Sequence, residues 1–339
     1  YLIAVSAPGG LDLLKSGLAQ PAANGAAAEN RVFVAVESAP IWTPDGVKTT
    51  AELRFGDVVE VAGVRDSLLL LTGQEHAIQQ RDVVPLRSMV TRIVDLDPPS
   101  VSDKMDPRFY DHPHHKGVWV AVDEVNGVKF WKEDGHIENV SVEVLANNAA
   151  PAVLRVVNRW LNDAGEHVVT ETTTIRITPD RLFVYDIQFT AGDSPATFED
   201  TKEGLFAIRL PNSMREYVSH GPVRSAEGKE GTKAAWGRES AWIDYVGAID
   251  GQQFGVTLLD APNNPWPSRY HVRDYGLFSI NPFGTAAYSK GSDNEQPARP
   301  LTLDPGKTIS FRYGLHVHQG VLSADELATL NARFVQAGE

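Results

Sequence analysis

The chain contains no cysteine among its 339 residues. This absence excludes disulfides, thiol nucleophiles and cysteine-ligated zinc or iron–sulfur centres. Long apolar runs are missing too: no stretch of about 18 consecutive apolar residues occurs, so the sequence predicts no membrane-spanning helix. What remains is a globular composition with 42% apolar residues, enough to build a sizeable core.

Positively charged residues are fewer than negatively charged ones. The chain has 31 Lys and Arg residues against 44 Asp and Glu, a formal net charge of -13. Because an acidic chain repels phosphate backbones, we predict no nucleic-acid partner. The Walker, Rossmann and G-x-S-x-G fingerprints are absent as well, so no nucleotide-binding or serine-hydrolase motif is indicated.

The first 108 residues are predicted to form a small module between two connecting segments. Residues 1–30 form a lead-in or linker, and their opening YLIAVSA resembles the end of a signal peptide. Residues 31–87 contain five short strand patterns separated by turn signals, which indicates a small β-barrel. The order of these strands resembles bacterial SH3-like domains, with a generic β-meander as the alternative. Residues 88–108 form a Pro- and Asp-bearing connector.

The remaining residues, 109–339, are dense in strand patterns of 5–10 residues with NG, DG and PD turn signals between them. Repeated antiparallel strands without intervening helices predict a large antiparallel β-sandwich. One helix is expected over 322–334, where Ser323 and Glu326 form a capping box ahead of apolar residues. The predicted fold class is therefore all-β, with a short C-terminal helix.

The stretch DHPHHK at 111–116 gathers three of the ten histidines beside Asp111 and Lys116. His112 and His114 lie two residues apart, so an extended segment directs both to one side and His115 to the other. Imidazole titrates near neutrality, which makes His114 or His115 a candidate acid or base.

A second H-x-H pattern occurs at His316 and His318, on the opposite strand face from Phe311 and Tyr313. H-x-H on a strand is a recurrent metal-ligand spacing. We expect no cofactor; a divalent metal is the alternative, with His112, His114, His316 and His318 as its ligands if the two pairs meet. In the other interpretation these histidines form hydrogen bonds to loops or to sugar hydroxyls.

Two further clusters carry titratable groups. In DTKEGLFAIRLP, Asp200, Lys202, Glu203 and Arg209 form a cluster, with Glu203 and Arg209 on one strand face. These residues either cradle a polar ligand or form a structural ion pair. The proline-rich stretch NNPWPSRYHVRDYG combines aromatic rings with amides and charged groups, a mixture that suits sugars. Its candidate binding residues are Asn264, Tyr270, His271, Arg273 and Asp274. A structured corner with buried polar residues is the alternative.

The block from about 109 to 320 resembles a bacterial family of large β-sandwich proteins that often carry the label "methane oxygenase PmoA". The stretches that carry the resemblance are DHPHHKGVWVAVDEVNGVKFW, DTKEGLFAIRLP, WIDYVG, GVTLLDAPNNPWPSRYHVRDYGLFSINPFG and FRYGLHVHQG. The label itself is set aside, because a methane monooxygenase subunit spans the membrane. The resemblance implies a fold similar to galactose mutarotase and polysaccharide lyases and a role in carbohydrate metabolism. Members usually carry a longer β-rich N-terminal half than this chain does.

We therefore expect a carbohydrate-active enzyme: a lyase, hydrolase or epimerase of the cell envelope, periplasm or extracellular space. The predicted catalytic residues are His114, His115 and Glu203. The predicted substrate-binding residues are Asp111, His112, Lys116, Lys202, Arg209, Asn264, Tyr270, His271, Arg273 and Asp274. The alternatives are a non-catalytic glycan-binding or structural envelope protein, whose SH3-like module binds a cell-wall or protein partner and which forms a homo-oligomer, and a metal-dependent enzyme.

Overall fold

The computed structural model describes residues 31–34, 38–54, 58–73, 75–85, 112, 114–115, 117–146, 151–211, 214–249 and 252–337. The predicted lead-in and connector lie outside these residues, as do Asp111 and Lys116. In the described part of the chain no helix is long and apolar enough to cross a membrane.

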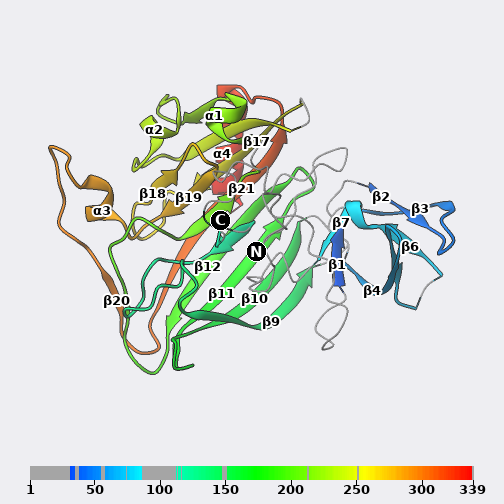
Figure 1. The fold of residues 1–339 in the computed structure, drawn as a ribbon, viewed down its shortest axis with the longest axis horizontal. Coiled ribbons are helices and arrows are strands. Elements are labelled where there is room, and N and C mark those ends of the chain that lie inside the picture. Colours follow the sequence, from blue (N-terminus) through cyan, green and yellow to red (C-terminus); the bar gives the residue numbers. More distant parts are fainter. Residues whose placement is uncertain are drawn as a thin grey trace, which may run out of the picture.

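The N-terminal segment forms a seven-stranded antiparallel sheet (Figure 1). Its strands are β1 (Arg31–Val34), β2 (Ser38–Trp42), β3 (Lys48–Arg54), β4 (Val58–Arg65), β5 (Leu68–Leu71), β6 (Ala77–Gln79) and β7 (Val83–Pro85), and a 3-10 turn, η1 (Gln80–Asp82), precedes β7. Small and branched apolar side chains fill its core: Ala39, Val61, Leu69, Leu71, Ile78 and Val83.

The all-β prediction for this segment is confirmed, but two details differ. The segment has seven strands rather than five, because the first strand pattern divides into β1 and β2 and a further short strand, β6, precedes η1. Strand β1 also pairs with β7. Neighbouring strands follow the order β3-β2-β6-β5-β4-β1-β7, and among the described residues no ladder joins β3 to β7. The sheet is therefore open where the sequence predicted a closed barrel. The SH3-like assignment stays a prediction.

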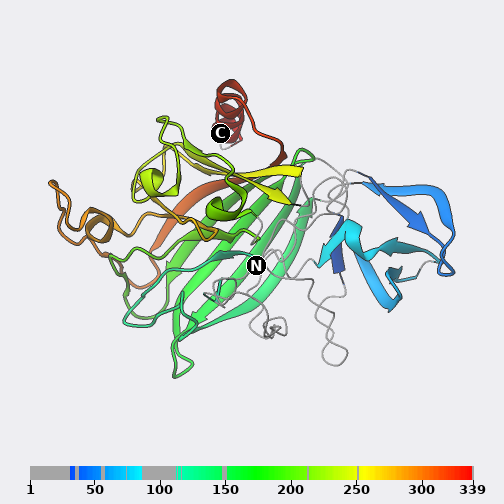
Figure 2. The same ribbon diagram turned by 45° about the horizontal axis from the view of Figure 1, so that its top comes forward.

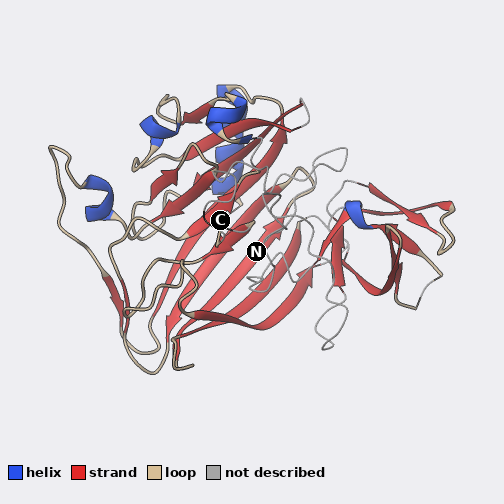
Figure 3. Cartoon of the chain, in the orientation of Figure 1, coloured by secondary structure: helices blue, strands red, loops and turns tan. Residues whose placement is uncertain are grey.

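The C-terminal block is built on an eight-stranded antiparallel sheet in the order β15-β16-β17-β21-β12-β11-β10-β9. Its members are β9 (His136–Ala146), β10 (Ala152–Leu161), β11 (His167–Ile177), β12 (Leu182–Ala191), β15 (Val223–Ser225), β16 (Trp242–Ile249), β17 (Gln252–Asp260) and β21 (Thr308–Gln319). On β10 every second side chain is buried, which is the period expected of a strand with one face on a core. Figure 3 shows that strands dominate this block.

A four-stranded sheet faces the large one, in the order β18-β19-β14-β8. It consists of β8 (Val118–Val120), β14 (Phe206–Arg209), β18 (Arg269–Val272) and β19 (Leu277–Asn281), and a separate pair joins β13 (Ala196–Phe198) to β20 (Leu301–Leu303). Aromatic rings fill the space between the layers: the ring of Phe206 lies 4.6 Å from that of Tyr185 and 5.9 Å from that of Tyr313. The predicted two-sheet sandwich is confirmed.

The C-terminal helix α4 (Ala324–Gln336) packs on the outer face of the large sheet (Figure 2). Ser323 caps it and forms the predicted capping box with Glu326. Its buried residues Leu327, Leu330 and Phe334 contact the sheet residues Leu182, Val184, Leu259 and Ala261. Burying each large apolar side chain contributes about 1.5–3 kcal/mol. Three other helices are a single turn or little more: α1 (Glu216–Ser219), α2 (Thr232–Ala235) and α3 (Thr285–Ser289).

Candidate functional site

The four-stranded sheet has one face on the core and one directed away from it, and strand register decides which residues lie on each. Phe206 pairs with Ile280, and Ile280 with Tyr270, so these three face the core beside the large sheet. The next row, Ala207, Ser279 and His271, faces the other way. We call this outward side the site face, because most of the predicted site residues lie on it.

Three histidines of the DHPHH stretch, His112, His114 and His115, lie at the site face, where the rings of His112 and His115 are part of a stack. The His112 ring is parallel to that of Tyr275 at 4.9 Å and to that of His115 at 4.8 Å, and His115 in turn stacks on Trp119 at 5.3 Å. His112 has a positive φ of 53°, and its carbonyl accepts a hydrogen bond from the His115 amide. This tight turn places His112 and His115 on the same side, whereas an extended segment would have separated them.

His115 is buried between two hydrogen-bond donors. The Trp131 indole donates to its Nε2 at 3.2 Å, and an Arg209 Nη1 lies 3.1 Å from its Nδ1. Indole and guanidinium groups only donate, and a neutral imidazole accepts through only one nitrogen. If both ring nitrogens of His115 carried a proton, each N–H group would point at another donor rather than at an acceptor. This geometry suits a positioning role better than the predicted acid or base role; His114, partly exposed beside it, keeps that prediction.

Hydrogen bonds from residues of α3 and β18 hold the loop DTKEG (200–204) in place. Asp200 accepts hydrogen bonds from the amides of Ala286 at 3.0 Å and Arg299 at 2.8 Å, so its carboxylate is engaged in the loop structure. The Lys202 carbonyl accepts two more, from the Tyr288 hydroxyl at 2.5 Å and from His271 Nδ1 at 3.1 Å. The Lys202 ammonium forms an ion pair with Glu203.

Glu203 faces a second carboxylate, Asp123. The β8–β14 ladder pairs Val120 with Phe206 and continues past the strand ends, because the Ala121 amide donates to the Leu205 carbonyl and the Asp123 amide to the Glu203 carbonyl, both at 3.0 Å. Asp123 and Glu203 are therefore directly opposite each other with side chains on one face, where like charges are destabilising. We call them the carboxylate pair.

The environment of the carboxylate pair favours a proton on Asp123. Burial raises the pKa of its carboxyl, and the negative charge of Glu203 raises it further. Its Oδ1 atom is buried and has no hydrogen-bond partner in the described part of the chain. Two adjacent carboxyl groups with different environments can divide the roles of proton donor and proton acceptor.

His271 completes this side of the site. Burial lowers the pKa of its imidazole to about 3, and the positive charges of Arg273 and Lys202 lower it further. His271 is therefore neutral, with its Nδ1 proton donated to the Lys202 carbonyl and its Nε2 left as an acceptor. Arg273 is exposed and lies over the Tyr275 ring, with 5.7 Å between its guanidinium carbon and the ring centre.

Three predicted binding residues have structural roles instead. Tyr270 is on the core face, fully buried, and donates to the Leu258 carbonyl. Asn264 uses its amide to bind Asp260 and the backbone of Arg312. Arg209 is fully buried behind His115. Asp274 is exposed, and its carbonyl accepts from the Glu216 amide.

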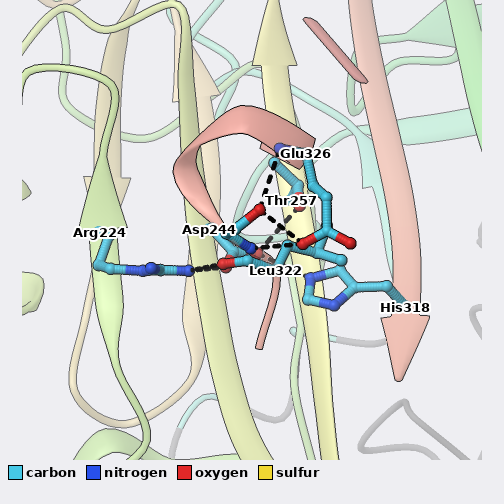
Figure 4. Close-up of polar contacts among 7 residues, drawn as sticks. Arg224, Asp244, Thr257, His318, Leu322 and Glu326 are labelled. Atoms are coloured by element: carbon cyan, nitrogen blue, oxygen red, sulfur yellow. Dashed lines mark hydrogen bonds and ion pairs between the residues drawn. The ribbon is translucent and has the colours of Figure 1, made fainter. Parts of the chain in front are cut away.

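The two H-x-H patterns do not meet. His316 and His318 lie on the outer face of the large sheet, where His316 Nε2 contacts the Asp180 carbonyl at 3.1 Å and His318 Nε2 contacts Asp244 at 2.8 Å (Figure 4). In the part of the chain that the structure describes, no group of three or more His, Asp and Glu side chains is arranged to hold a metal ion. The four histidines therefore do not form one ligand set, because strand alternation places the second pair on a different face of a different sheet.

A family model described as a family of unknown function (DUF6807) matches residues 87–332. The chain belongs to this family. The family description names no activity, so the likeness to mutarotases and lyases and the methane oxygenase label gain no support from it. No curated protein sequence matches the chain.

Two solved structures share a remote likeness with the chain. One is a β-arabinopyranosidase, at 12% identity and a TM-score of 0.29, with 60% of this chain and 32% of that one covered. The other is a polysaccharide lyase, at 13% identity and a TM-score of 0.24, with 66% and 31% covered. The chain thus spans about a third of either length, and TM-scores this low do not establish a common architecture.

Sequence reasoning missed two members of the site, Asp123 and Tyr275. Asp123 lies in the stretch VAVDEV, where strand alternation alone gives no sign of its partner. Only the register of β8 against β14 reveals that it faces Glu203. Tyr275 follows Arg273 by two residues and Asp274 by one, and a tyrosine next to charged residues was the available signal.

Proposed function

We propose that the protein acts on a carbohydrate by acid–base chemistry at the carboxylate pair. The observation that carries this proposal is the cross-strand placement of Asp123 opposite Glu203 on a partly exposed sheet face. Opposed like charges cost stability, and perturbed carboxyl groups of this kind concentrate at catalytic sites.

The proposed roles follow from the two environments. Asp123, whose pKa is raised by burial and by Glu203, acts as the proton donor. Glu203, paired with Lys202, acts as the proton acceptor. This division suits reactions that remove one proton and deliver another, which include the elimination, hydrolysis and epimerisation of sugars. His114 lies at the same face and is the proposed auxiliary acid or base.

The surrounding groups support a polyhydroxylated ligand. The neutral His271 offers Nε2 as an acceptor for a hydroxyl, while Lys202 and Arg273 offer exposed donors. Sugars need such a mixture of acceptors and donors around their hydroxyl groups.

Turnover of a panel of oligosaccharides tests the proposal. Glu203→Gln and Asp123→Asn should each lower the rate about 10²- to 10⁴-fold while the circular dichroism spectrum stays native. Glu138→Gln, which changes a partly exposed residue of β9 that pairs with Arg159 on the large sheet, is the matched control and should leave the rate unchanged. Full activity in both variants of the pair would refute the proposal.

A non-catalytic glycan-binding protein is the second candidate. The burial of His115 between Trp131 and Arg209 favours it, because this removes one of the predicted catalytic residues from contact with a ligand. Calorimetry on wild-type protein and on Asp123→Asn separates the two candidates. A wild-type protein that binds saccharide without turning it over, and a variant that binds it equally well, would support the binding protein.

A further inference from the structure

Two guanidinium groups and one imidazole ring surround the Tyr275 ring. The guanidinium carbons of Arg209 and Arg273 lie 4.9 Å and 5.7 Å from its centre, and the His112 ring is parallel to it at 4.9 Å. Lys202 adds a fourth group, since its charge and that of Arg273 both act on His271. This concentration of positive charge occurs in a chain whose net charge is -13.

These cations differ in what they can reach. Arg209 is fully buried against His115, so it supports the site from behind. Lys202 is half exposed but is already bonded to Glu203. Arg273 is exposed, and among the described residues its guanidinium contacts the Tyr275 ring and forms no ion pair with a carboxylate. Arg273 is thus the cation best placed to meet a negative charge from outside.

The position of Arg273 relates it to the proposed chemistry. It follows β18 two residues after His271, and its backbone amide is fixed by a 2.8 Å hydrogen bond to the Leu277 carbonyl. His271 is in turn bonded to the backbone of Lys202, the residue before Glu203. A ligand group bound by Arg273 therefore lies on the same sheet face as the carboxylate pair.

We propose that the substrate is an acidic sugar, a uronic acid unit whose carboxylate binds the Arg273 guanidinium. This inference rests on the proposed carbohydrate function. A guanidinium presents two parallel N–H groups that match the two oxygens of a carboxylate, and the pair is stronger than a hydrogen bond to a neutral hydroxyl. A neutral sugar would leave this exposed cation without a countercharge.

Binding measured by calorimetry with matched saccharides tests the inference. The panel contains uronic-acid oligosaccharides, the methyl esters of the same oligosaccharides, neutral oligosaccharides and sulfated ones. Methyl esterification removes the charge and keeps the sugar. Wild-type protein should bind at least one uronate about tenfold more tightly than its ester, and this preference should weaken with added salt.

Arg273→Gln should abolish the preference and leave the affinity for the ester within about twofold. Arg155→Gln is the control, because Arg155 is an exposed arginine of β10 paired with Glu143 and has no place in the site; it should keep the preference.

The outcomes separate the two proposals. Equal binding of uronates and esters, binding of sulfated or neutral saccharides alone, or a preference that survives Arg273→Gln would each overturn the acidic-sugar inference and leave the carbohydrate function standing. Failure of every saccharide to bind or to be turned over would overturn both.

Discussion

Two aspartates of the sandwich, Asp244 and Asp123, have opposite surroundings. Asp244 is fully buried on β16, and its oxygens bind Thr257 at 2.9 Å, His318 at 2.8 Å and Arg224 at 3.2 Å (Figure 4). We call this group the Asp244 network. Asp123 is partly exposed, faces Glu203, and has one oxygen without a hydrogen-bond partner in the described part of the chain.

The difference agrees with a structural role for Asp244 and with the role proposed for Asp123. In the Asp244 network every charge has an opposite or hydrogen-bonding neighbour, and Arg224 also binds the Leu322 carbonyl just before α4. In the carboxylate pair each carboxyl group has a like-charged group directly opposite, which costs folding free energy even though Lys202 pairs with Glu203. Proteins retain such costs mainly where activity requires them. Four predictions test this contrast, from the largest expected effect to the smallest.

Asp244→Ala should lower the free energy of unfolding by about 3–5 kcal/mol, because it leaves the buried His318 and the partly buried Arg224 without their carboxylate partner. Urea denaturation followed by circular dichroism measures the loss. Asp293→Ala, in an exposed loop, is the control and should unfold like wild type. Equal midpoints for the two variants would show that the network does not stabilise the fold.

Ser323→Ala should lower the free energy of unfolding by about 1 kcal/mol, since it removes the cap of α4 next to the Asp244 network. Ser323→Asp, which also accepts from the Glu326 amide, should restore most of the loss. The same denaturation experiment tests both variants, and a loss shared by Ser323→Asp would contradict a capping role.

Asp123→Asn should raise the free energy of unfolding at neutral pH by about 0.5 kcal/mol, because it removes the repulsion within the carboxylate pair. Folding raises the pKa of Asp123, so the native state binds this proton more tightly than the unfolded chain does. Its contribution to stability is then largest in acid and falls as the pH rises through the raised pKa. The gain should accordingly disappear below the ordinary aspartate pKa. Thermal unfolding at several pH values measures it; a gain that is independent of pH would contradict the repulsion.

Arg333→Gln should lower the free energy of unfolding by only about 0.3 kcal/mol. Arg333 of α4 pairs with Asp180 at 2.6 Å, but both side chains are nearly half exposed, at 48% and 44%. Added salt should remove the difference between variant and wild type in the same denaturation assay. A loss of unfolding free energy close to that of Asp244→Ala would contradict the expectation that an exposed ion pair stabilises the fold much less than a buried one.

Local patterns predicted much of the fold. Alternation and turn signals located the long strands of the sandwich, and Ser323 with Glu326 marked the start of α4. The sequence could not predict whether the N-terminal sheet is open or closed, because closure depends on contacts between strands that are distant in sequence. The composition of a strand does not report which edge it occupies.

The sequence predicted only part of the site, because pairing between strands that are distant in sequence decides which residues come together. His112, Glu203 and His271 come from three separate stretches, and the structure places all three stretches at one face. Tyr270 and His271 are an example. Alternation along the strand places neighbouring side chains on opposite faces, with Tyr270 in the core and His271 at the site face. The sequence alone does not reveal which of the two faces the core. His316 and His318 were assigned to the correct side of β21, but a sandwich has two outer faces and alternation does not choose between them.

The extension of the β8–β14 ladder beyond the named strands has a consequence for catalysis. Backbone hydrogen bonds hold Asp123 opposite Glu203, although both residues lie just beyond the ends of β8 and β14. Their separation is therefore set before any ligand arrives, and binding requires little reorganisation of the charged groups. In the proposed site, selectivity would then depend on the spacing of the two carboxyl groups rather than on closure around the bound molecule.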